Sequence, residues 1–481
     1  MRRQSVLVLV VLLGSCYHLP LWSGEVKVEA LTRESIAKCG NGATTEAGAA
    51  AITRFPYLQS TTTTSTIVAW GSRNPHGRVV ISEPDGGAEV VTADAGYAGD
   101  PDRLEGRKAA WKDKTEDLRA EDIYVVSAKV AGLKPTHLYC YQIFNDEIAL
   151  TEKAPMTTAA AADDKEHVKF VALGDTGTGG PAQRAIAQWI SAQPFDFMVF
   201  LGDIAYESGT AKQLQENFFA VYRNFLRFVP VYPALGNHER RTRQGRPYLE
   251  AFVLPEPERY YSFDWGPIHF VCIDTTQRDS AQLVWLDDDL GKNKLPWTIV
   301  FGHHPMYTNS LRGAQLWIRR AFSKIVTKHK VDIVLTGHEH QYERFKINGT
   351  NYIVSGGGGG RLTRFFGTSR ALTQFTVHHF LAFDVTAKEL DMCVIDISGR
   401  ELEKLHLTKG DGGENKAKVN DKPETKQNVV PPEEKVVPDE KLHDEPDDDE
   451  KRKKAGPPEP ATTNPTPATP LPAPAAEQKK P

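Results

Sequence analysis

The chain has 481 residues, of which 40% are hydrophobic and 25% are charged, an ordinary composition for a soluble globular protein. This length is sufficient for two or three domains with cores of their own. The formal net charge of -4 gives no sign of nucleic-acid binding, so we expect no nucleic-acid partner.

The N-terminus, residues 1–16, reads "MRRQSVLVLVVLLGSC". Its apolar run follows two arginines and is shorter than the roughly 20 residues that span a bilayer, so it predicts a signal peptide. The end, Leu-Gly-Ser-Cys, is similar to a bacterial lipobox, which would make Cys16 the lipidated residue. An ordinary signal peptide with an incidental cysteine is the alternative. We expect the protein to be exported across the inner membrane. It would then be a lipoprotein held at the membrane only through Cys16, or a periplasmic or extracellular protein.

Four further cysteines contain no CxxC pair, so a thiolate metal site is not expected. Export permits disulfides, but the spacing does not tell which residues pair. Two of the four lie in apolar strand-like runs and are expected to be core residues. The four are Cys39, Cys140, Cys272 and Cys393, of which the last two are the expected core residues.

Residues 17–50 show little periodicity and predict a tether. From 51 to 160, short strand patterns such as "STIVAWGS" and "HLYCYQIF" alternate with turns, which predicts a β-sandwich. The stretch "LKPTHLYCYQI" (133–143) resembles the tyrosine corner of fibronectin-type sandwiches, with Tyr139 as the corner residue. We therefore expect an all-β fibronectin III-like domain that acts as a spacer or binds a partner.

The pattern changes after residue 166. "VKFVALGD", "PAQRAIAQWISAQ" and "FDFMVFLGD" read as strand, amphipathic helix and strand, and units of this kind continue to about residue 408. The sequence therefore predicts an α/β domain over 166–408. "SGGGGG" (355–360) lacks the Lys-Ser/Thr of a P-loop and predicts a flexible loop beside the site. Residues 409–481 are rich in proline and charge, which predicts a disordered tail.

Five short stretches of the α/β segment place Asp, Asn, His or Tyr at the ends of apolar runs. They are "LGDTGTGG" (Asp175), "LGDIAY" (Asp203, Tyr206), "LGNHE" (Asn237, His238), "FGHHP" (His303) and "TGHEHQYER" (His338, His340). Each alone could be a turn, a cap or a structural histidine. Residues just past the carboxyl ends of strands in an α/β sheet converge, however, so together they predict one site. Oxygen ligands mixed with imidazoles suit Fe, Mn or Zn, and there are enough of them for two ions.

The order D-x-G, G-D-x-x-Y, G-N-H, H-x-P, G-H-x-H resembles the purple acid phosphatases, within the calcineurin-like metallophosphoesterases. The resemblance covers about residues 168 to 400, and the preceding sandwich resembles the domain before the catalytic domain in plant and related bacterial members. Related enzymes outside this branch carry D-x-H in the first motif and no tyrosine in the second. The resemblance implies a four-layer αββα sandwich as the catalytic fold.

The resemblance also implies a ligand set for two metal ions. Asp203 would bridge an Fe(III) ion and a divalent ion, which would be Fe, Zn or Mn. His303 is preferred to His304 because the family's ligand precedes x-Pro. The other ligands would be Asp175, Tyr206 and His340 at the iron, and Asn237, His303 and His338 at the divalent ion.

The activity so implied is that of an extracytoplasmic acid phosphatase, which hydrolyses phosphate monoesters by attack of a metal-bound hydroxide. His238 would contact the phosphate or protonate the leaving oxygen. The family usually has a second histidine nine residues after the H-x-P ligand. In this chain Arg312 occupies that position. We expect Arg312 to bind phosphate, and the alternative is a solvated loop residue. Two other functions stay open: a phosphodiesterase or nucleotidase on the same dinuclear site, and a non-catalytic surface binding protein.

Overall fold

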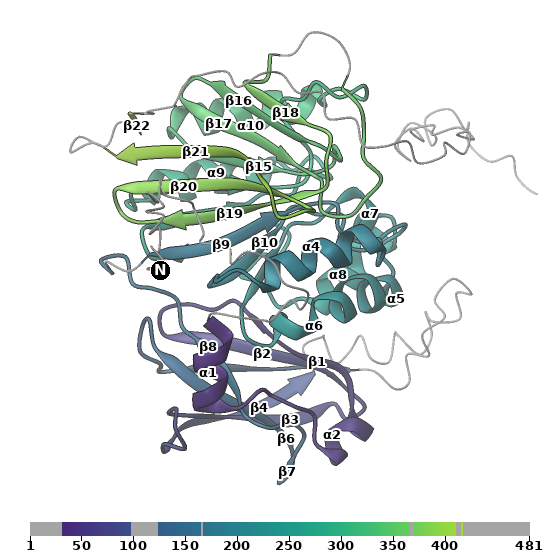
Figure 1. Cartoon of the computed structure of the whole chain (residues 1–481), viewed down its shortest axis with the longest axis vertical. Coiled ribbons are helices and arrows are strands. Elements are labelled where there is room, and N and C mark those ends of the chain that lie inside the picture. Colours follow the sequence, from purple (N-terminus) through teal and green to yellow (C-terminus); the bar gives the residue numbers. More distant parts are fainter. Residues whose placement is uncertain (1–30, 98–123, 165–166, 366–369, 410–414, 417–481) are drawn as a thin grey trace, which may run out of the picture. The chain divides into compact units, whose positions relative to one another are not determined.

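The computed structural model describes residues 31–97, 124–164, 167–365, 370–409 and 415–416. The predicted signal peptide with Cys16 and the predicted tail from residue 417 onward lie outside them. Within the described part, the strands form three hydrogen-bonded sheets, one of eight strands and two of seven (Figure 1). Among the described helices, none has both the length and the apolar character needed to cross a membrane.

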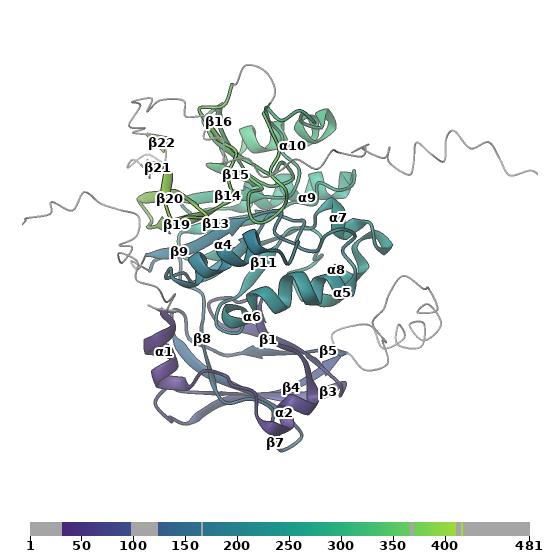
Figure 2. The ribbon, with the colours of Figure 1, turned by 45° about the vertical axis from the view of Figure 1, so that its right-hand side comes forward.

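The first sheet is antiparallel and falls within the segment predicted to be all β. Its strands are β1 (Ile52–Gln59), β2 (Ser65–Ser72), β3 (His76–Ser82), β4 (Glu89–Tyr97), β5 (Tyr124–Ala131), β6 (Leu138–Asn145), β7 (Ile148–Ala149) and β8 (Ala154–Thr157). They are joined in the order β1-β2-β5-β4-β3-β6-β7, with β8 on β6. Only the end of β4 pairs with β5, so the sheet folds over into two layers that share one core, which includes Trp70 and Tyr141 (Figure 2).

A tyrosine in this sheet makes the contact that defines a tyrosine corner. The buried Tyr139 hydroxyl accepts a hydrogen bond from the amide of Lys134, five residues upstream, at 3.0 Å. This confirms the interpretation of "LKPTHLY" as a corner. The fibronectin III-like character of the whole domain stays a prediction.

The expectation of a tether over residues 17–50 is wrong where the structure describes that segment. Two helices occupy it, α1 (Leu31–Cys39) and α2 (Glu46–Ala51). A disulfide joins Cys39 to Cys140 in β6, and Ile36 packs against the core of the first sheet. The sequence did not show this because the cross-link and the packing surface are about a hundred residues away along the chain.

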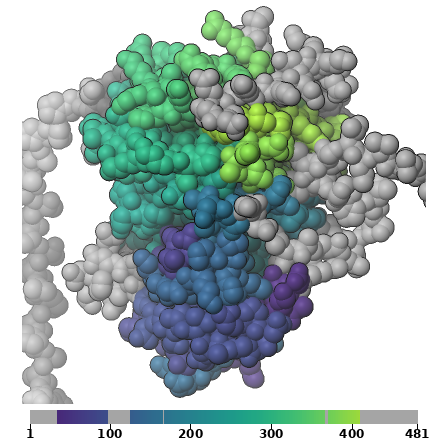
Figure 3. All heavy atoms as spheres, turned by 90° about the vertical axis from the view of Figure 1, so that its left-hand side faces the viewer, coloured from purple at the N-terminus to yellow at the C-terminus, as the bar shows by residue number. Residues whose placement is uncertain are grey.

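The second sheet carries the first three of the five motifs. Its strands are β9 (Val168–Leu173), β10 (Phe197–Phe200), β11 (Val231–Pro233), β19 (His379–Val385), β20 (Glu389–Asp396), β21 (Glu401–Lys409) and β22 (Asn415–Lys416), in the order β11-β10-β9-β19-β20-β21-β22. The strands β9, β10 and β11 are parallel, and the rest continue antiparallel. Strands β20 and β21 appear in yellow-green at the surface in Figure 3. Strand β22, within the predicted tail, pairs with β21.

The third sheet carries the last two motifs. Its strands are β12 (Tyr261–Trp265), β13 (Ile268–Cys272), β14 (Trp297–Phe301), β15 (Ile333–Thr336), β16 (Tyr342–Ile347), β17 (Thr350–Ser355) and β18 (Thr373–Phe375), in the order β12-β13-β14-β15-β17-β16-β18. The strands β13, β14, β15 and β17 are parallel. Strands β16 and β17 form a hairpin around Asn348 and Gly349, both with positive φ, as the Asn-Gly pair requires.

Helices cover the outer faces of both sheets (Figures 1 and 2). They are α4 (Pro181–Ser191), α5 (Ala211–Gln213), the π-helical η2 (Leu214–Phe219), α6 (Ala220–Leu226), α7 (Asn237–Arg240), the 3-10 turn η3 (Arg243–Gly245), α8 (Arg246–Ala251), α9 (Ser280–Lys292) and α10 (Leu316–Lys328). Ile186 of α4 and Tyr222 of α6 pack on the second sheet, whereas Leu286 of α9 and Phe322 of α10 pack on the third. In α4 and α10 the buried residues recur every three to four positions, which is the amphipathic pattern that the sequence showed for α4.

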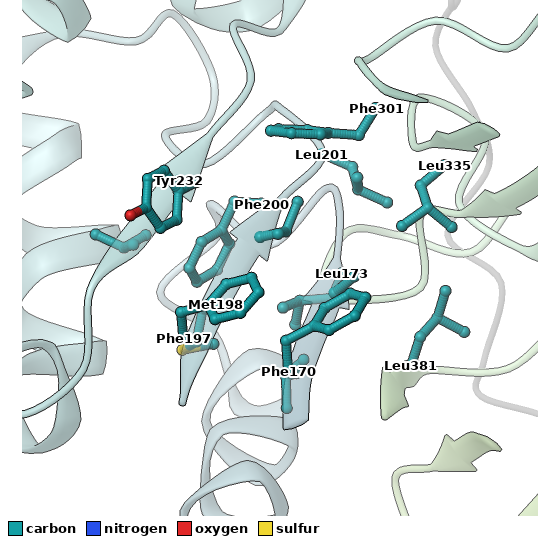
Figure 4. Packing of buried hydrophobic residues seen from close by; sticks show 14 of the residues in the cluster. Phe170, Leu173, Phe197, Met198, Phe200, Leu201, Tyr232, Phe301, Leu335 and Leu381 are labelled. Carbon is teal, nitrogen blue, oxygen red and sulfur yellow. The ribbon is translucent and has the colours of Figure 1, made fainter. Parts of the chain in front are cut away.

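The inner faces of the second and third sheets pack on each other. Aromatic rings dominate the contact: Phe170 of β9 meets Phe270 of β13 edge to face at 5.1 Å, and Phe197 of β10 meets Phe263 of β12 at 5.9 Å. Figure 4 shows part of this core, with side chains of β9, β10 and β11 beside Phe301 of β14 and Leu335 of β15. The layers are therefore helix, sheet, sheet, helix, as the predicted αββα fold requires.

Candidate metal centre

The five motifs lie where parallel strands end. Asp175 and Asp203 follow β9 and β10, and Asn237 follows β11 at the start of α7. His303 and His338 follow β14 and β15 of the other sheet. Because the two sheets stack, these strand ends reach the same place, and the structure brings the motif residues together.

Three of the site residues have backbones that non-glycine residues rarely adopt. Asp175, Asp203 and His338 have φ values of 59°, 52° and 69°. Such conformations cost of order 1–3 kcal/mol each and persist where the surrounding structure holds them. Here they turn each side chain from the end of a strand back into the site.

One group of side chains consists of Asp175, Tyr206 and His340. The Tyr206 hydroxyl is 3.1 Å from Oδ1 of Asp175 and 3.0 Å from Nε2 of His340. The same nitrogen is 3.2 Å from Oδ1 of Asp175. Nδ1 of His340 donates to the carbonyl of Arg361 at 2.6 Å, which leaves Nε2 as the nitrogen that faces the group.

A second group consists of Asn237, His303 and His338. Oδ1 of Asn237 is 2.9 Å from Nε2 of His303 and 3.0 Å from Nδ1 of His338. The two ring nitrogens are 3.3 Å apart. Nδ1 of His303 donates to the carbonyl of Leu201 at 2.8 Å, so Nε2 is again directed into the site.

Asp203 lies between the two groups. Its Oδ2 is 3.3 Å from Nε2 of His303, and ligand atoms of Asp175, Asp203 and His303 all lie within 4.8 Å of one another. The structure therefore divides the seven predicted ligands into two sets of three joined by Asp203. The role of these seven residues as metal ligands stays a prediction.

The charges in the site fit bound cations. Although burial opposes ionisation, the neighbouring His303 and His238 hold the pKa of Asp203 well below its usual range. Burial, and after it the charge of Asp175, raises the pKa of Tyr206 well above its usual value. A Tyr206 phenolate therefore needs a cation nearby to offset these effects. Carboxylates, a phenol, an amide oxygen and imidazoles are the donors that iron, zinc and manganese accept, so the residues fit the two ions.

His304, the residue passed over in favour of His303, is also buried beside the site. Its ring centroid is 4.5 Å from that of His338, and it could supply a ligand atom together with His303 and His338. Its Nδ1, however, lies 3.0 Å from the hydroxyl of Thr275. Burial, with the charge of His303 as the next cause, lowers the pKa of His304 to about 3. Of the two histidines, His303 contacts both Asp203 and Asn237, which favours His303 over His304 as the ligand.

His238 is oriented by a backbone carbonyl. Its Nδ1 donates to the carbonyl oxygen of Glu207 at 2.6 Å, and its amide donates to Oδ1 of Asp203 at 2.9 Å. Nε2 then lies on the side of the site, 3.8 Å from Oδ2 of Asp203. The neutral ring is held with its proton on Nδ1, so a proton gained at Nε2 is the one available for transfer.

Arg312 is exposed on a loop beside the site. Its backbone amide donates to the hydroxyl of Ser310 at 3.1 Å, and its charge is among those that act on His338 and Glu339. The structure thus places Arg312 close to the histidine end of the site.

Two buried glutamates beside the ligands were missed by the sequence reasoning. Glu239 accepts hydrogen bonds from the amides of Gly236, Asp203, Ile204 and Ala205 at 2.9–3.0 Å. Its place three residues after the helix cap in "GNHE" is a capping-box signal that could have identified it. Burial, then the charge of Asp203, raises the pKa of Glu239 to about 8.

The second, Glu339, is fully buried between His338 and His340 along the chain, with Oε1 4.0 Å from Nε2 of His338. Burial raises the pKa of this carboxyl to about 7. No local pattern marks such a residue, because its burial depends on strands from elsewhere.

The prediction of a flexible loop at "SGGGGG" is wrong. Gly356, Gly357 and Gly358 are buried, and the amides of Gly358 and Gly360 donate to the carbonyls of Gly174 and Asp175 at 3.0 and 2.8 Å. A Cβ on Gly356 would lie 2.7 Å from Oδ2 of Asp175. The glycines are present because backbone packs directly against the first motif, and this leaves no room for side chains.

Comparison with known proteins agrees with this geometry. Residues 168–342 match the family described as calcineurin-like phosphoesterase. Purple acid phosphatase 21 of Arabidopsis thaliana is 30% identical over 261 residues, which cover 48% of this chain and 58% of that protein. Purple acid phosphatase 22 of the same plant is 26% identical over 291 residues, which cover 56% of this chain and 64% of that protein.

A solved structure is also similar to this chain. The purple acid phosphatase PPD1 from yellow lupin (Lupinus luteus) seeds aligns with a TM-score of 0.64 and 20% identity, over 74% of each chain, which shows a shared fold. Residues 168–342 thus match a calcineurin-like phosphoesterase domain, and purple acid phosphatases are among the proteins similar to this chain. It spans less than two thirds of the length of the two plant relatives.

Proposed function

We propose that this protein is a dinuclear metal-dependent phosphomonoesterase of the acid phosphatase type, most active at acid pH. The observation that carries the proposal is the position of Asp203 between two groups of ligand side chains, 3.3 Å from His303 and within 4.8 Å of Asp175. One carboxylate with a ligand group on either side is what a bridged pair of ions needs.

Each ligand group suits one of the two ions. The group with Tyr206 would hold Fe(III), because a phenolate is a hard anionic ligand; the group with two histidines and Asn237 would hold a divalent Fe, Zn or Mn ion. Two such cations would neutralise the phosphate oxygens and activate water.

The chain's own residues complete the chemistry. His238 presents Nε2 to the site, where it can bind a phosphate oxygen or give a proton to the leaving oxygen. Arg312 would bind the phosphate through its guanidinium, which is always charged and therefore cannot act as the acid. This leaves His238 as the residue proposed to donate the proton.

The proposed location is outside the cytoplasm. The N-terminal 16 residues have the pattern of a secretory signal with a lipobox at Cys16. The disulfide between Cys39 and Cys140 supports export, because such bonds persist in oxidising compartments. We further propose that the first sheet, with its tyrosine corner, is a fibronectin III-like domain over about 51–160, and that the catalytic domain covers about 166–408.

The test compares hydrolysis of p-nitrophenyl phosphate and of bis(p-nitrophenyl) phosphate by the purified protein, with metal analysis of the same sample. The proposal expects about two metal ions per chain and faster hydrolysis of the monoester. Asp203→Asn should remove most activity and lower the content of both metals. The matched control is Asp196→Asn. Asp196 accepts a hydrogen bond from the amide of Lys169 and is not a proposed ligand, so this variant should keep the metal content of the wild type. Faster hydrolysis of the diester would favour the phosphodiesterase alternative. A purified protein without metal and without activity would favour the non-catalytic binding protein.

A further inference from the structure

Two loops beside the site are positively charged, although the whole chain has a net charge of -4. Residues 305–316 include Arg312 and no acidic residue, and residues 355–365 include Arg361 and Arg364 and no acidic residue. All three arginines are exposed. These two loops therefore add three positive charges and no negative charge beside the site.

The second of these loops, residues 355–365, runs from His340 of the site to the loop that carries Arg312. The carbonyl of Arg361 accepts the hydrogen bond from Nδ1 of His340, and the amide of Thr363 donates to the carbonyl of His340 at 3.1 Å. Phe365 then forms a β-bridge with Ser310, two residues before Arg312. The backbone of residues 361–365 is therefore anchored between the Tyr206 group and the Arg312 loop, and it carries Arg361 and Arg364 beside the site.

A third segment adds Arg241 on the side of His238. Its Nη1 donates to the carbonyl of Glu207 at 2.9 Å, and the same oxygen accepts the hydrogen bond from Nδ1 of His238. The ion pair of Arg241 with the exposed Glu207 carboxylate has an N–O distance of 4.0 Å, and an exposed pair of this kind binds weakly. Its guanidinium is thus held beside the catalytic histidine without a strong competing anion.

The chemistry of these groups matches a substrate with more than one phosphate. The phosphate that reacts is accounted for by the two ions, His238 and Arg312. Guanidinium groups bind further phosphates through paired, charge-assisted hydrogen bonds, and they attract anions from a distance. An uncharged leaving group such as p-nitrophenol would use none of these contacts.

We propose that Arg361, Arg364 and Arg241 bind a second phosphate carried by the leaving group, so that the preferred substrates are phosphate esters with at least two phosphates. This inference rests on the proposed phosphomonoesterase activity. The second phosphate can be linked directly to the first, as in a nucleoside triphosphate, or placed elsewhere on the molecule, as in a sugar bisphosphate.

The test measures kcat/KM for matched pairs: adenosine triphosphate with adenosine monophosphate, and fructose 1,6-bisphosphate with fructose 6-phosphate. In at least one pair, kcat/KM should be about tenfold higher for the member with more phosphates. This is the effect expected of one charge-assisted hydrogen bond. The variant with both Arg361→Gln and Arg364→Gln should lose most of that preference, and added salt should weaken it. Which pair responds tells whether the second phosphate is adjacent or distant.

A matched control is Arg320→Gln, which changes an exposed arginine on α10, outside the two loops and the segment of Arg241, and should keep the preference. Hydrolysis of p-nitrophenyl phosphate without any preference in either pair would overturn the inference and leave the phosphomonoesterase in place. A preference that survives the double variant would also overturn it. Absence of hydrolysis of p-nitrophenyl phosphate by metal-loaded protein would instead overturn the proposed function itself.

Discussion

The hydroxyl of Tyr206 donates a hydrogen bond to Oδ1 of Asp175 across 3.1 Å, although the two residues follow different strands. Tyr206→Phe removes this oxygen but keeps the ring, which packs edge to face on His238 at 4.5 Å. We expect the variant to lose the violet absorption of a tyrosinate–iron pair and part of its iron, measured by visible spectroscopy and metal analysis. Tyr261→Phe is the control, because that buried hydroxyl binds the carbonyl of Pro233. A wild type that binds only zinc and has no colour would contradict the iron assignment.

Arg312→Ala should weaken phosphate binding without affecting the metals. Its exposed guanidinium lies on the loop beside His338 and is not one of the seven ligands. We expect KM for p-nitrophenyl phosphate to rise about tenfold, the loss of one charge-assisted contact. Metal content should stay that of the wild type, and Arg320→Ala serves as the control. If KM and kcat are both unchanged, Arg312 is a solvated loop residue.

Glu239→Ala should destabilise the catalytic domain and disturb the metal centre. The substitution leaves four buried amides, including that of Asp203, without their acceptor. We expect a loss of at least about 3 kcal/mol in the free energy of unfolding. Urea unfolding and metal analysis measure the two effects, and Glu207→Ala, at an exposed side chain, is the comparison. Wild-type stability in Glu239→Ala would show that water replaces the carboxylate.

Gly356→Ala should lower metal content although glycine is no ligand. Its Cβ would lie 2.7 Å from Oδ2 of Asp175 and 2.3 Å from the carbonyl oxygen of Glu339, so one of them has to move. Gly291→Ala in α9 is the control, because its Cβ meets only a histidine carbon at an ordinary distance of 3.5 Å. We expect that variant to be as stable as the wild type or slightly more stable. Equal metal content in both variants would mean that the glycine segment can shift freely.

His269 should make stability depend on pH far from the metal centre. Its ring nitrogens lie 2.6 Å from Oδ1 of Asp264 and 2.9 Å from Oδ2 of Asp289. Burial opposes the charged form, but the two carboxylates raise the pKa of His269 to about 9. Because the folded pKa exceeds the unfolded value of about 6.5, the stabilisation is complete below pH 6.5 and is lost as pH rises through about 9.

Unfolding of His269→Gln at pH 5.5 and at pH 10 measures this contribution. At pH 5.5 we expect the free energy of unfolding to be about 2 kcal/mol lower in the variant than in the wild type. This figure is reduced because the exposed Asp264 is screened by solvent. At pH 10 we expect little difference. His167→Gln, which changes a more exposed histidine paired with Asp384, should show a smaller difference. A pH-independent difference for His269→Gln would assign its effect to packing.

Local sequence patterns were sufficient for most elements and for finding the motifs that the structure brings together. "STIVAWGS" coincides with β2 (Ser65–Ser72), and the Asn-Gly turn lies between β16 and β17 as expected. Strand alternation, helix periodicity and turn chemistry act over a few residues, so they can be read from the chain. The motif residues were recognisable because each follows a strand, and parallel strand ends converge in this class of fold.

Other features were decided only by contacts between distant parts of the chain. The segment taken for a tether is held by the disulfide to Cys140, about a hundred residues away. The glycines after residue 355 are tightly packed because they meet Asp175, and Glu239 is a structural acceptor because the loop of Asp203 folds over it. A residue's burial and partners depend on which strands become neighbours. Long-range packing therefore decides whether a glycine run is loose or compact and whether a glutamate is solvated or buried.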